Sequence, residues 1–351
     1  MTESVATLRS ANLYTELADT IRESGLLQRR HVWYARRFAV AVAAWVVTWV
    51  LFAWLGNSWF QLLPAGALGV LMTQFGFLGH DAAHRQVFRS GRANDWAARI
   101  CAGVFAGLSL EWWKGKHNRH HAAPNQVGRD PDIAPGAVAF TPEIVERRTG
   151  VPGWLTERQG WWFFPLLTLE GLNLHAASVR PLWSGAAPRP QRIDSAVVLV
   201  RLTAYVTVLL LVLPPGKAAA FVAVQSAVFG FCLGAAFAPN HTGMPIVPEG
   251  ARIDFLRRQV LMSRNVRGGW WVDVALGGLN YQIEHHLFPS MPRPSLRRAQ
   301  PLIRDFCHRH DVSYTEVGLV ESYSIVVDYL NNVGLRARDP FACPIVAQHR
   351  R

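Results

Sequence analysis

The chain has 351 residues, of which half are hydrophobic and only 17% are charged, against roughly 25% in an average soluble domain. Its 36 Lys and Arg residues outnumber 24 Asp and Glu residues, which gives a net charge of +12. A basic chain suits either nucleic acid or anionic lipid headgroups, and the apolar segments described next favour lipid, so we expect no nucleic-acid partner. The four cysteines are far apart and form no CxxC pair, which argues against a disulfide framework or a cysteine-type zinc site and fits a reduced compartment.

Two uncharged segments near the N-terminus are each long enough to cross a membrane. They are residues 38–55 (FAVAVAAWVVTWVLFAWL) and 60–79 (FQLLPAGALGVLMTQFGFLG), and each fits a hydrocarbon core of about 30 Å as a helix. The short link between them predicts a transmembrane hairpin over residues 38–79, after a cytoplasmic N-terminal segment at residues 1–37.

A second hairpin is predicted over residues 195–239. Its first segment, residues 195–213, is broken only by Arg201, which either snorkels to the interface or faces a polar cavity; its second segment, residues 218–239, is uncharged. Arginines gather before the first segment and in residues 80–194 and 240–351, whereas the two tight links carry a single lysine. By the positive-inside rule, both termini and the long middle segment face the cytoplasm.

Two shorter apolar segments lie inside that middle region. Residues 100–110 (ICAGVFAGLSL) and 161–169 (WWFFPLLTL) are too short to span a bilayer. We expect helices that lie in the membrane interface or under a cytoplasmic domain.

Eight of the 13 histidines fall at four places. They form HDAAH (His80, His84), HNRHH (His117, His120, His121), PNH (His241) and QIEHH (His285, His286). Residues three and four apart share a face of a helix. His80 and His84 can therefore aim at one point, as can His117 with His120 and His121.

The position of these histidines favours one shared site. His80 follows the second apolar segment and His241 follows the fourth, and both segment ends are predicted to be cytoplasmic. A single histidine is usually structural, but four such groups at the ends of predicted spans favour a metal site. Eight imidazoles suffice for two ions, and imidazole suits Zn, Cu, Fe and Ni. Two ions beside a lipid phase suit oxygen activation by iron, because side chains alone cannot oxidise an unactivated C–H bond.

HDAAH, HNRHH and QIEHH resemble the three histidine boxes of the membrane fatty acid desaturase family, in order and spacing, over about residues 35–310. Gln282, in place of the first histidine of the third box, resembles the branch of front-end and linoleoyl-CoA-desaturase-like enzymes, as do DPDI (130–133) and SRNV (263–266). The resemblance implies an all-α membrane protein with four transmembrane helices in two hairpins under a helical cytoplasmic cap, which residues 80–194 and 240–351 would form. It also implies a di-iron site, O₂ as co-substrate, and a fatty acyl chain, linked to CoA or lipid, that is oxidised to a cis alkene. Zinc can replace iron in such a site.

The resemblance makes all eight of these histidines iron ligands. A neutral imidazole ligand needs an acceptor on its second nitrogen, and Asp81, Glu284 and either Asp130 or Asp132 are candidates, with surface carboxylates or helix caps as the alternative. We expect Gln282 to hydrogen bond or to orient a water, since a neutral amide is a poor iron ligand. His175 is either a ninth ligand or a structural histidine.

No HPGG motif of a fused cytochrome b5 occurs in the sequence, so we expect electrons from a separate ferredoxin or flavin reductase. One alternative is a hydroxylase or ketolase that uses the same boxes on a lipid or carotenoid. A more distant alternative is a transition-metal transporter, whose ligands should lie within the membrane on a path between spans. The sequence predicts no histidine within any span.

Overall fold

The computed structural model describes residues 2–335, with side chains from residue 13 onward. It divides the chain into two compact units. Unit 1 takes its residues from Met1–Gln28, Lys116–Phe163 and Ala236–Arg351, and unit 2 from Arg29–Gly115 and Phe164–Ala235. Three helices pass from one unit into the other: α5 (Leu110–Ala122), α8 (Gln159–Val179) and α10 (Pro215–His241).

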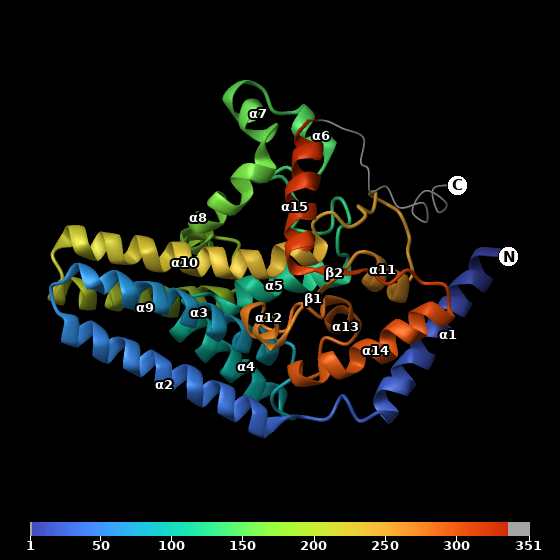
Figure 1. The fold of residues 1–351 in the computed structure, drawn as a ribbon, viewed down its shortest axis with the longest axis horizontal. Helices are drawn as coiled ribbons and strands as arrows, with labels where there is room; N and C mark the ends of the chain where they lie inside the picture. Colours follow the sequence, from blue (N-terminus) through green and yellow to red (C-terminus); the bar gives the residue numbers. More distant parts are fainter. Residues whose placement is uncertain (1, 336–351) are drawn as a thin grey trace. The chain divides into compact units, whose positions relative to one another are not determined.

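Unit 2 is built around long apolar helices (Figure 1). It contains α2 (His31–Leu55), η1 (Trp59–Gln61), α3 (Leu62–Ala83), α4 (Gly91–Arg99), the π-helical segment η2 (Ile100–Ala106), η3 (Arg180–Trp183), α9 (Arg189–Val212) and the larger parts of α8 and α10. Phe52, Leu68, Leu209 and Phe221 belong to one buried cluster, so α2, α3, α9 and α10 meet at a common core.

The prediction of four apolar spans is confirmed, since four helical stretches of the described residues are long and apolar enough to cross a membrane: His31–Leu55, Trp59–Ala83, Arg189–Val212 and Pro215–His241. Each helix is longer than the apolar run predicted from the sequence, because the residues that flank the run continue the helix. In α9, for example, Pro190 stands in the first turn, where its missing N–H costs nothing. Three of these stretches therefore contain a histidine: His31 is the first residue of one, and His80 and His241 lie in the last turns of two others. The prediction that no histidine lies within a span was wrong in this respect.

One of the two shorter apolar segments belongs to a longer helix than predicted, whereas residues 100–106 form η2 directly after α4 and residues 107–109 are not helical. Residues 161–169 lie within the 21-residue helix α8, and this helix packs closely on α10. A Cβ atom on Gly171 would lie 2.2 Å from the Ser226 carbonyl oxygen, and one on Gly230 would lie 2.3 Å from the Gly171 nitrogen. Small residues allow such backbone contact between apolar helices.

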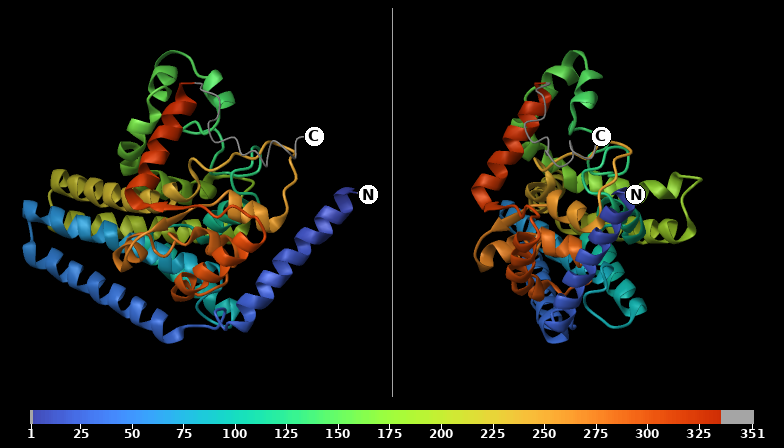
Figure 2. Two further views of the ribbon diagram at one scale, coloured as in Figure 1. Left: turned by 45° about the vertical axis from the view of Figure 1, so that its right-hand side comes forward. Right: turned by 90° about the vertical axis from the view of Figure 1, so that its right-hand side faces the viewer.

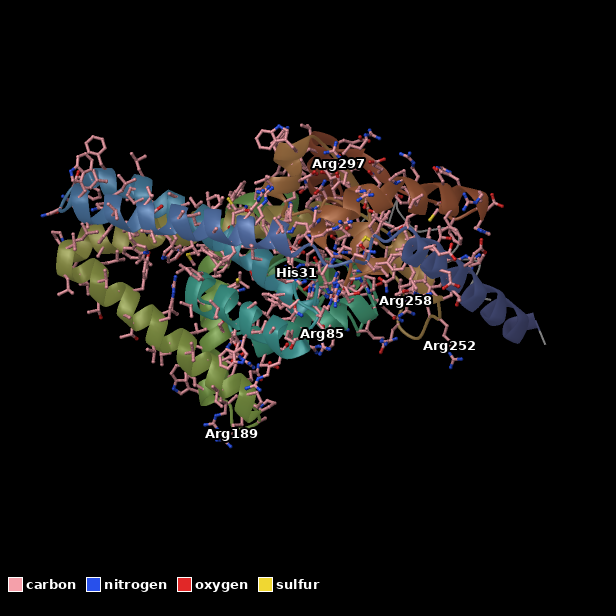
Figure 3. All side chains as sticks on the ribbon, turned by 90° about the horizontal axis from the view of Figure 1, so that it is seen from below. His31, Arg85, Arg189, Arg252, Arg258 and Arg297 are labelled. Atoms are coloured by element: carbon pink, nitrogen blue, oxygen red, sulfur yellow. The ribbon has the colours of Figure 1, made fainter. Side chains whose placement is uncertain are left out.

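Charge is unevenly distributed along the helices of unit 2. His31, Arg85 and Arg189 lie toward one end of these helices (Figure 3), where α2 and α9 begin and α3 ends. At the opposite end, Lys217 hydrogen bonds to the Asn57 side chain at 2.9 Å.

Unit 1 is helical as well (Figure 2), and its first helix packs against the helices of residues 255–261 and 293–309. It contains α1 (Thr2–Glu23), α6 (Pro142–Glu146), α7 (Gly150–Thr156), α11 (Phe255–Leu261), α12 (Trp270–Ala275), α13 (Gln282–Leu287), α14 (Arg293–Arg309) and α15 (Leu319–Gly334). Its core joins α1 to α11, α13 and α14 through residues such as Leu17, Leu256, Ile283 and Ile303. The sequence did not predict that residues 1–37 would begin with a helix that packs on the third histidine box.

A small sheet departs from the expected all-α fold. The strands β1 (Asn265–Arg267) and β2 (Glu316–Gly318) pair in parallel, with Asn265 opposite Glu316. Three-residue strands are too short to show the alternation that identifies a strand in a sequence. The sheet holds the SRNV segment against the chain that leads into α15.

Candidate metal centre

Three histidines of unit 1 meet in one group. His120 comes from α5, His241 from the last turn of α10, and His286 from α13, and one ring nitrogen of each lies within 4.8 Å of the others. The Nε2 atoms of His120 and His241 are 3.3 Å apart. His120 and His286 are buried.

The second ring nitrogen of each of these histidines faces an acceptor. The Nδ1 atom of His120 lies 3.0 Å from the Asp130 carboxylate, that of His241 lies 2.9 Å from the Met262 carbonyl, and that of His286 lies 2.9 Å from the Gln259 Oε1 atom. Carboxylates and carbonyls only accept, so each Nδ1 carries the proton and each Nε2 keeps its lone pair.

The Gln259 amide is itself held in one orientation. Its Nε2 atom donates to the His121 carbonyl at 3.0 Å, which requires the oxygen to face His286. The three lone pairs therefore converge, as they do around a metal ion whose histidine ligands are oriented by partners behind them.

The acidic residues of the DPDI segment strengthen this group. Asp130 is buried and also accepts hydrogen bonds from the backbone nitrogens of Asn125 and Asp132. Asp132 is partly exposed and pairs with Lys116 at 2.8 Å. Burial opposes a charge on His120, but the carboxylates of Asp132 and Asp130 outweigh it and raise the pKa of the ring. They favour positive charge there, which a metal ion provides as well as a proton does.

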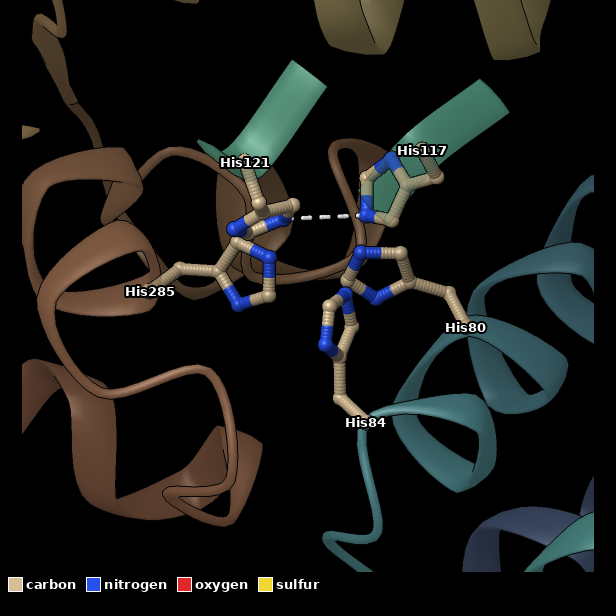
Figure 4. Close-up of side chains that lie close together, drawn as sticks. All are labelled: His80, His84, His117, His121 and His285. Atoms are coloured by element: carbon tan, nitrogen blue, oxygen red, sulfur yellow. Dashed lines mark hydrogen bonds between the residues drawn. The ribbon is translucent and has the colours of Figure 1, made fainter. Parts of the chain in front are cut away.

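A second histidine group in unit 1 consists of His117, His121 and His285 (Figure 4). The Nε2 atoms of His117 and His121, one turn apart on α5, are 3.0 Å apart, and the His285 ring centroid lies 4.9 Å from that of His121. We expected the three histidines of HNRHH to share one point. The structure instead separates His120 from the other two, so α5 serves both groups.

In unit 2, His80 and His84 form a pair at the end of α3. Their ring centroids are 4.6 Å apart, and both rings are drawn in Figure 4. The Nδ1 atom of His80 lies 3.5 Å from the Asp81 carboxylate, which is a long contact for the orienting role expected of Asp81. Burial and the neighbouring His80 lower the pKa of His84 well below its usual value, which keeps that ring neutral.

Gln282 lies at the ligand atoms of the first group. Its Nε2 atom is 2.9 Å from the His241 Nε2 atom, and its Oε1 atom accepts a hydrogen bond of 3.3 Å from Asn240. The side chain is thus positioned for the hydrogen-bonding role expected from the sequence.

Glu284 is fully buried and has partners that the sequence did not indicate. Its carboxylate accepts hydrogen bonds from the Tyr314 hydroxyl at 2.6 Å and from the Asn265 amide at 2.7 Å. Burial raises its pKa to about 7, although both hydrogen bonds oppose this shift. Glu284 thus ties the third box to β1 and to the segment before β2.

His175 lies in a different environment, on α8 in unit 2. Its Nδ1 atom contacts the Gly107 carbonyl at 3.0 Å. Burial, aided by the nearby Arg201 guanidinium, lowers its pKa to about 4. Among the described residues, His175 belongs to none of the groups that could hold a metal ion. The positive charge of the nearby Arg201 also disfavours a metal ion at this position.

Several residues that support the centre gave no signal in the sequence. Gln259 is the buried polar residue of an otherwise ordinary helix, and Met262 contributes only its carbonyl. Tyr14 of α1 donates from its hydroxyl to the Leu287 carbonyl at the end of α13, at 3.1 Å. These contacts join segments far apart in the chain, which local pattern cannot reveal.

Comparisons with known proteins match this chain to fatty acid desaturases. The family model described as "Fatty acid desaturase" matches residues 57–318. The chain is 28% identical over 346 residues to an acyl-lipid (9-3)-desaturase of Physcomitrium patens, which covers 94% of this chain and 64% of that protein. It is 30% identical to a Delta(5) fatty acid desaturase of Caenorhabditis elegans (95% and 76%) and 28% identical to Delta(8)-fatty-acid desaturase 2 of Arabidopsis thaliana (93% and 75%). The chain thus spans about two thirds to three quarters of the length of these relatives.

Proposed function

Because the chain belongs to the fatty acid desaturase family, we propose that it is a multi-pass membrane oxidoreductase that introduces a cis double bond into a fatty acyl chain. It uses O₂, a pair of iron ions, and electrons from a separate redox carrier. Both termini and the metal centre face the cytoplasm. The acyl group is carried on lipid or on CoA.

The convergence of His120, His241 and His286 carries this proposal. Each ring has its Nδ1 proton engaged by a protein acceptor, so that three Nε2 lone pairs face one point. Three imidazoles with further positions left open suit a metal ion that has to bind a reactant as well as the protein. This donor set fits iron, and it also accepts zinc.

We assign the remaining box histidines to the second ion. His117, His121 and His285 supply three nitrogens, and His80 and His84 are proposed to add two more. The assignment of His80 and His84 rests on their match to the first histidine box and on the short distance of 4.6 Å between their ring centroids. Gln282 and Asn240 are proposed to hydrogen bond to reactants or water at the first ion rather than to ligate it.

The electron balance of the reaction requires a reductant. Reduction of O₂ to two water molecules takes four electrons, and the acyl chain provides two when it loses two hydrogens and becomes an alkene. A donor such as a ferredoxin or a flavin reductase supplies the other two, together with two protons from water. The iron pair supplies the oxidising power for the C–H bonds, which no side chain can provide.

The protein's own contribution is to position the acyl chain. The methylene that lies nearest the metal pair loses its hydrogen first, so the shape of the acyl site decides the double-bond position. Hydroxylation would begin in the same way and differ in its product. Relatives named as desaturases of acyl lipids and fatty acids, together with Gln282 in the third box, favour desaturation.

The test is the fatty-acid profile of a host that expresses the chain with a ferredoxin and its reductase, measured by gas chromatography with mass spectrometry. The inactive variant is His285→Ala, and the matched control is His308→Ala, which alters an exposed histidine of α14. All proteins are compared at equal folded amounts, judged by size-exclusion chromatography in detergent. We expect a new unsaturated acid with the wild type and His308→Ala, and none with His285→Ala.

Other products would decide between the alternatives. A hydroxy acid would identify a hydroxylase. An unchanged acyl profile, with iron content and donor reduction verified, would refute the acyl substrate, and metal uptake by the cells that depends on the same histidines would indicate a transporter.

A further inference from the structure

The end of α10 is held by a segment that the proposed function leaves without a role. Residues 262–264 run beside the last turn of this helix, within unit 1. The Met262 carbonyl accepts from the His241 Nδ1 atom at 2.9 Å, and the Arg264 backbone nitrogen donates to the Asn240 carbonyl at 2.8 Å. The segment therefore contacts His241 and its chain neighbour directly.

The Arg264 side chain completes this hold. It is 2% exposed, and it is among the largest fully buried side chains of the described residues. Its Nε atom donates to the Pro239 carbonyl at 2.9 Å, and its Nη2 atom donates to both the Pro239 and Thr242 carbonyls, the latter at 2.9 Å. One guanidinium thus bonds the backbone on both sides of His241.

A helix end explains why a cation is useful at this position. The last carbonyls of a helix lack N–H partners within the helix, and together they carry partial negative charge. Asn125 bonds the His241 carbonyl at 3.0 Å, so the final turn of α10 is satisfied from outside the helix at four consecutive carbonyls, from Pro239 to Thr242. Three of these four carbonyls are bonded by Arg264.

We propose that Arg264 is a positioning residue for the metal centre: its planar guanidinium fixes the last turn of α10 and thereby aims the His241 imidazole at the group formed with His120 and His286. Lysine cannot replace it, because an ammonium on a shorter stem does not reproduce a rigid fork of donors. This inference rests on the proposed function, since it assumes that His241 holds a metal ion.

The experiment measures Co(II) binding to the purified full chain in detergent, by titration and by the visible spectrum of bound Co(II). The variants are Arg264→Lys, Arg264→Gln and His241→Ala. The matched control is Arg267→Lys, which changes an exposed arginine three residues further along, in β1, that bonds the Glu316 carbonyl. Thermal midpoints of the metal-free proteins show whether each variant is folded.

We expect two Co(II) per wild-type chain and per Arg267→Lys chain. His241→Ala should lose the tight binding of one ion. Both Arg264 variants should bind that same ion roughly ten- to hundredfold more weakly, as is typical when an orienting partner of a ligand is removed, with an altered Co(II) spectrum and a metal-free midpoint close to that of His241→Ala. Combined with His241→Ala, Arg264→Lys should cause no further loss.

The inference would be overturned if the Arg264 variants bound both ions as tightly as the wild type while His241→Ala lost one. It would also be overturned if they failed to fold where His241→Ala folds, because the role of Arg264 would then be general stability. A wild-type chain that binds fewer than two Co(II) would instead refute the di-metal assignment on which the inference rests.

Discussion

Replacement of Asp130 by asparagine tests how the first histidine group would hold the proposed metal ion. The two carboxylate oxygens each accept one backbone hydrogen bond, from Asn125 at 2.7 Å and from Asp132 at 2.9 Å, and both lie within 3.1 Å of the His120 Nδ1 atom. An asparagine side chain must place its NH₂ group against one of these backbone N–H donors, whichever way it is turned. That buried clash should destabilise the metal-free protein by about 1–3 kcal/mol.

The effect on the metal is separate from the effect on the fold. An amide neither carries the charge that attracts a cation nor forces the His120 proton onto Nδ1, so the Nε2 lone pair is no longer guaranteed. We expect the apparent affinity for the ion held by His120 to fall ten- to hundredfold, roughly 1.4–2.8 kcal/mol. Competition between the protein and a chromophoric chelator for Co(II) measures this affinity.

Asp132→Asn is the matched control. This carboxylate is 44% exposed, pairs with Lys116 and lies 3.3 Å from the same ring nitrogen, so its loss should weaken binding by less than about threefold. Equal losses in the two variants would refute the view that the buried hydrogen bonds of Asp130 orient the ligand. Unchanged binding in Asp130→Asn would refute it as well.

Three further substitutions test the packing around the site, each by thermal or chemical unfolding in detergent. Gly171→Ala should destabilise the protein by about 1–3 kcal/mol, because the new Cβ would meet the Ser226 carbonyl, whereas Gly66→Ala, with open space around it, should not; equal effects would contradict close packing of α8 on α10. Tyr14→Phe should cost about 0.5–1.5 kcal/mol by removing the hydrogen bond to Leu287, and a neutral result would show that α1 does not hold the third box through this contact. His175 has its pKa lowered from 6.5 to about 4 in the folded chain, so the unfolded chain binds the extra proton first. The contribution of His175 to the free energy of unfolding, roughly 3 kcal/mol, should be present above pH 6.5 and be lost as pH falls toward 4. His175→Gln should remove this part of the pH dependence of stability. If the pH dependence persists in the variant, other groups cause it.

The sequence was sufficient for the elements whose signal is local. An uncharged run of about 20 residues has few structural alternatives, so residues 38–55 and 218–239 were placed correctly within α2 and α10. Histidines three or four apart are likewise predicted to share one face of a helix, as His117 and His121 do. Only the ends of the helices were misjudged, because His80 and Asp81 extend α3 without being apolar.

Contacts between distant segments were beyond the reach of the sequence. Nothing in its neighbourhood marks Gln259 as the acceptor for His286, because that role depends on α11 lying beside α13. The acceptor for His241 is a backbone carbonyl. Every residue has one, so the type of residue at position 262 does not identify it as the acceptor. Glu284 was expected to orient an imidazole, yet its carboxylate accepts hydrogen bonds from Tyr314 and Asn265, which lie 30 and 19 residues away in the sequence.

The two histidine doublets carry information that their spacing alone did not disclose. Successive residues of an α-helix point about 100° apart, so adjacent histidines cannot converge on one point, whereas residues four apart differ by only about 40°. In the structure His121 joins His117 while His120 turns to His241, and His285 and His286 divide in the same way between the two groups. Each doublet thus contributes one ring to each group. Under the proposed function each group holds one ion, so the doublets on α5 and α13 would each supply one ligand to each ion.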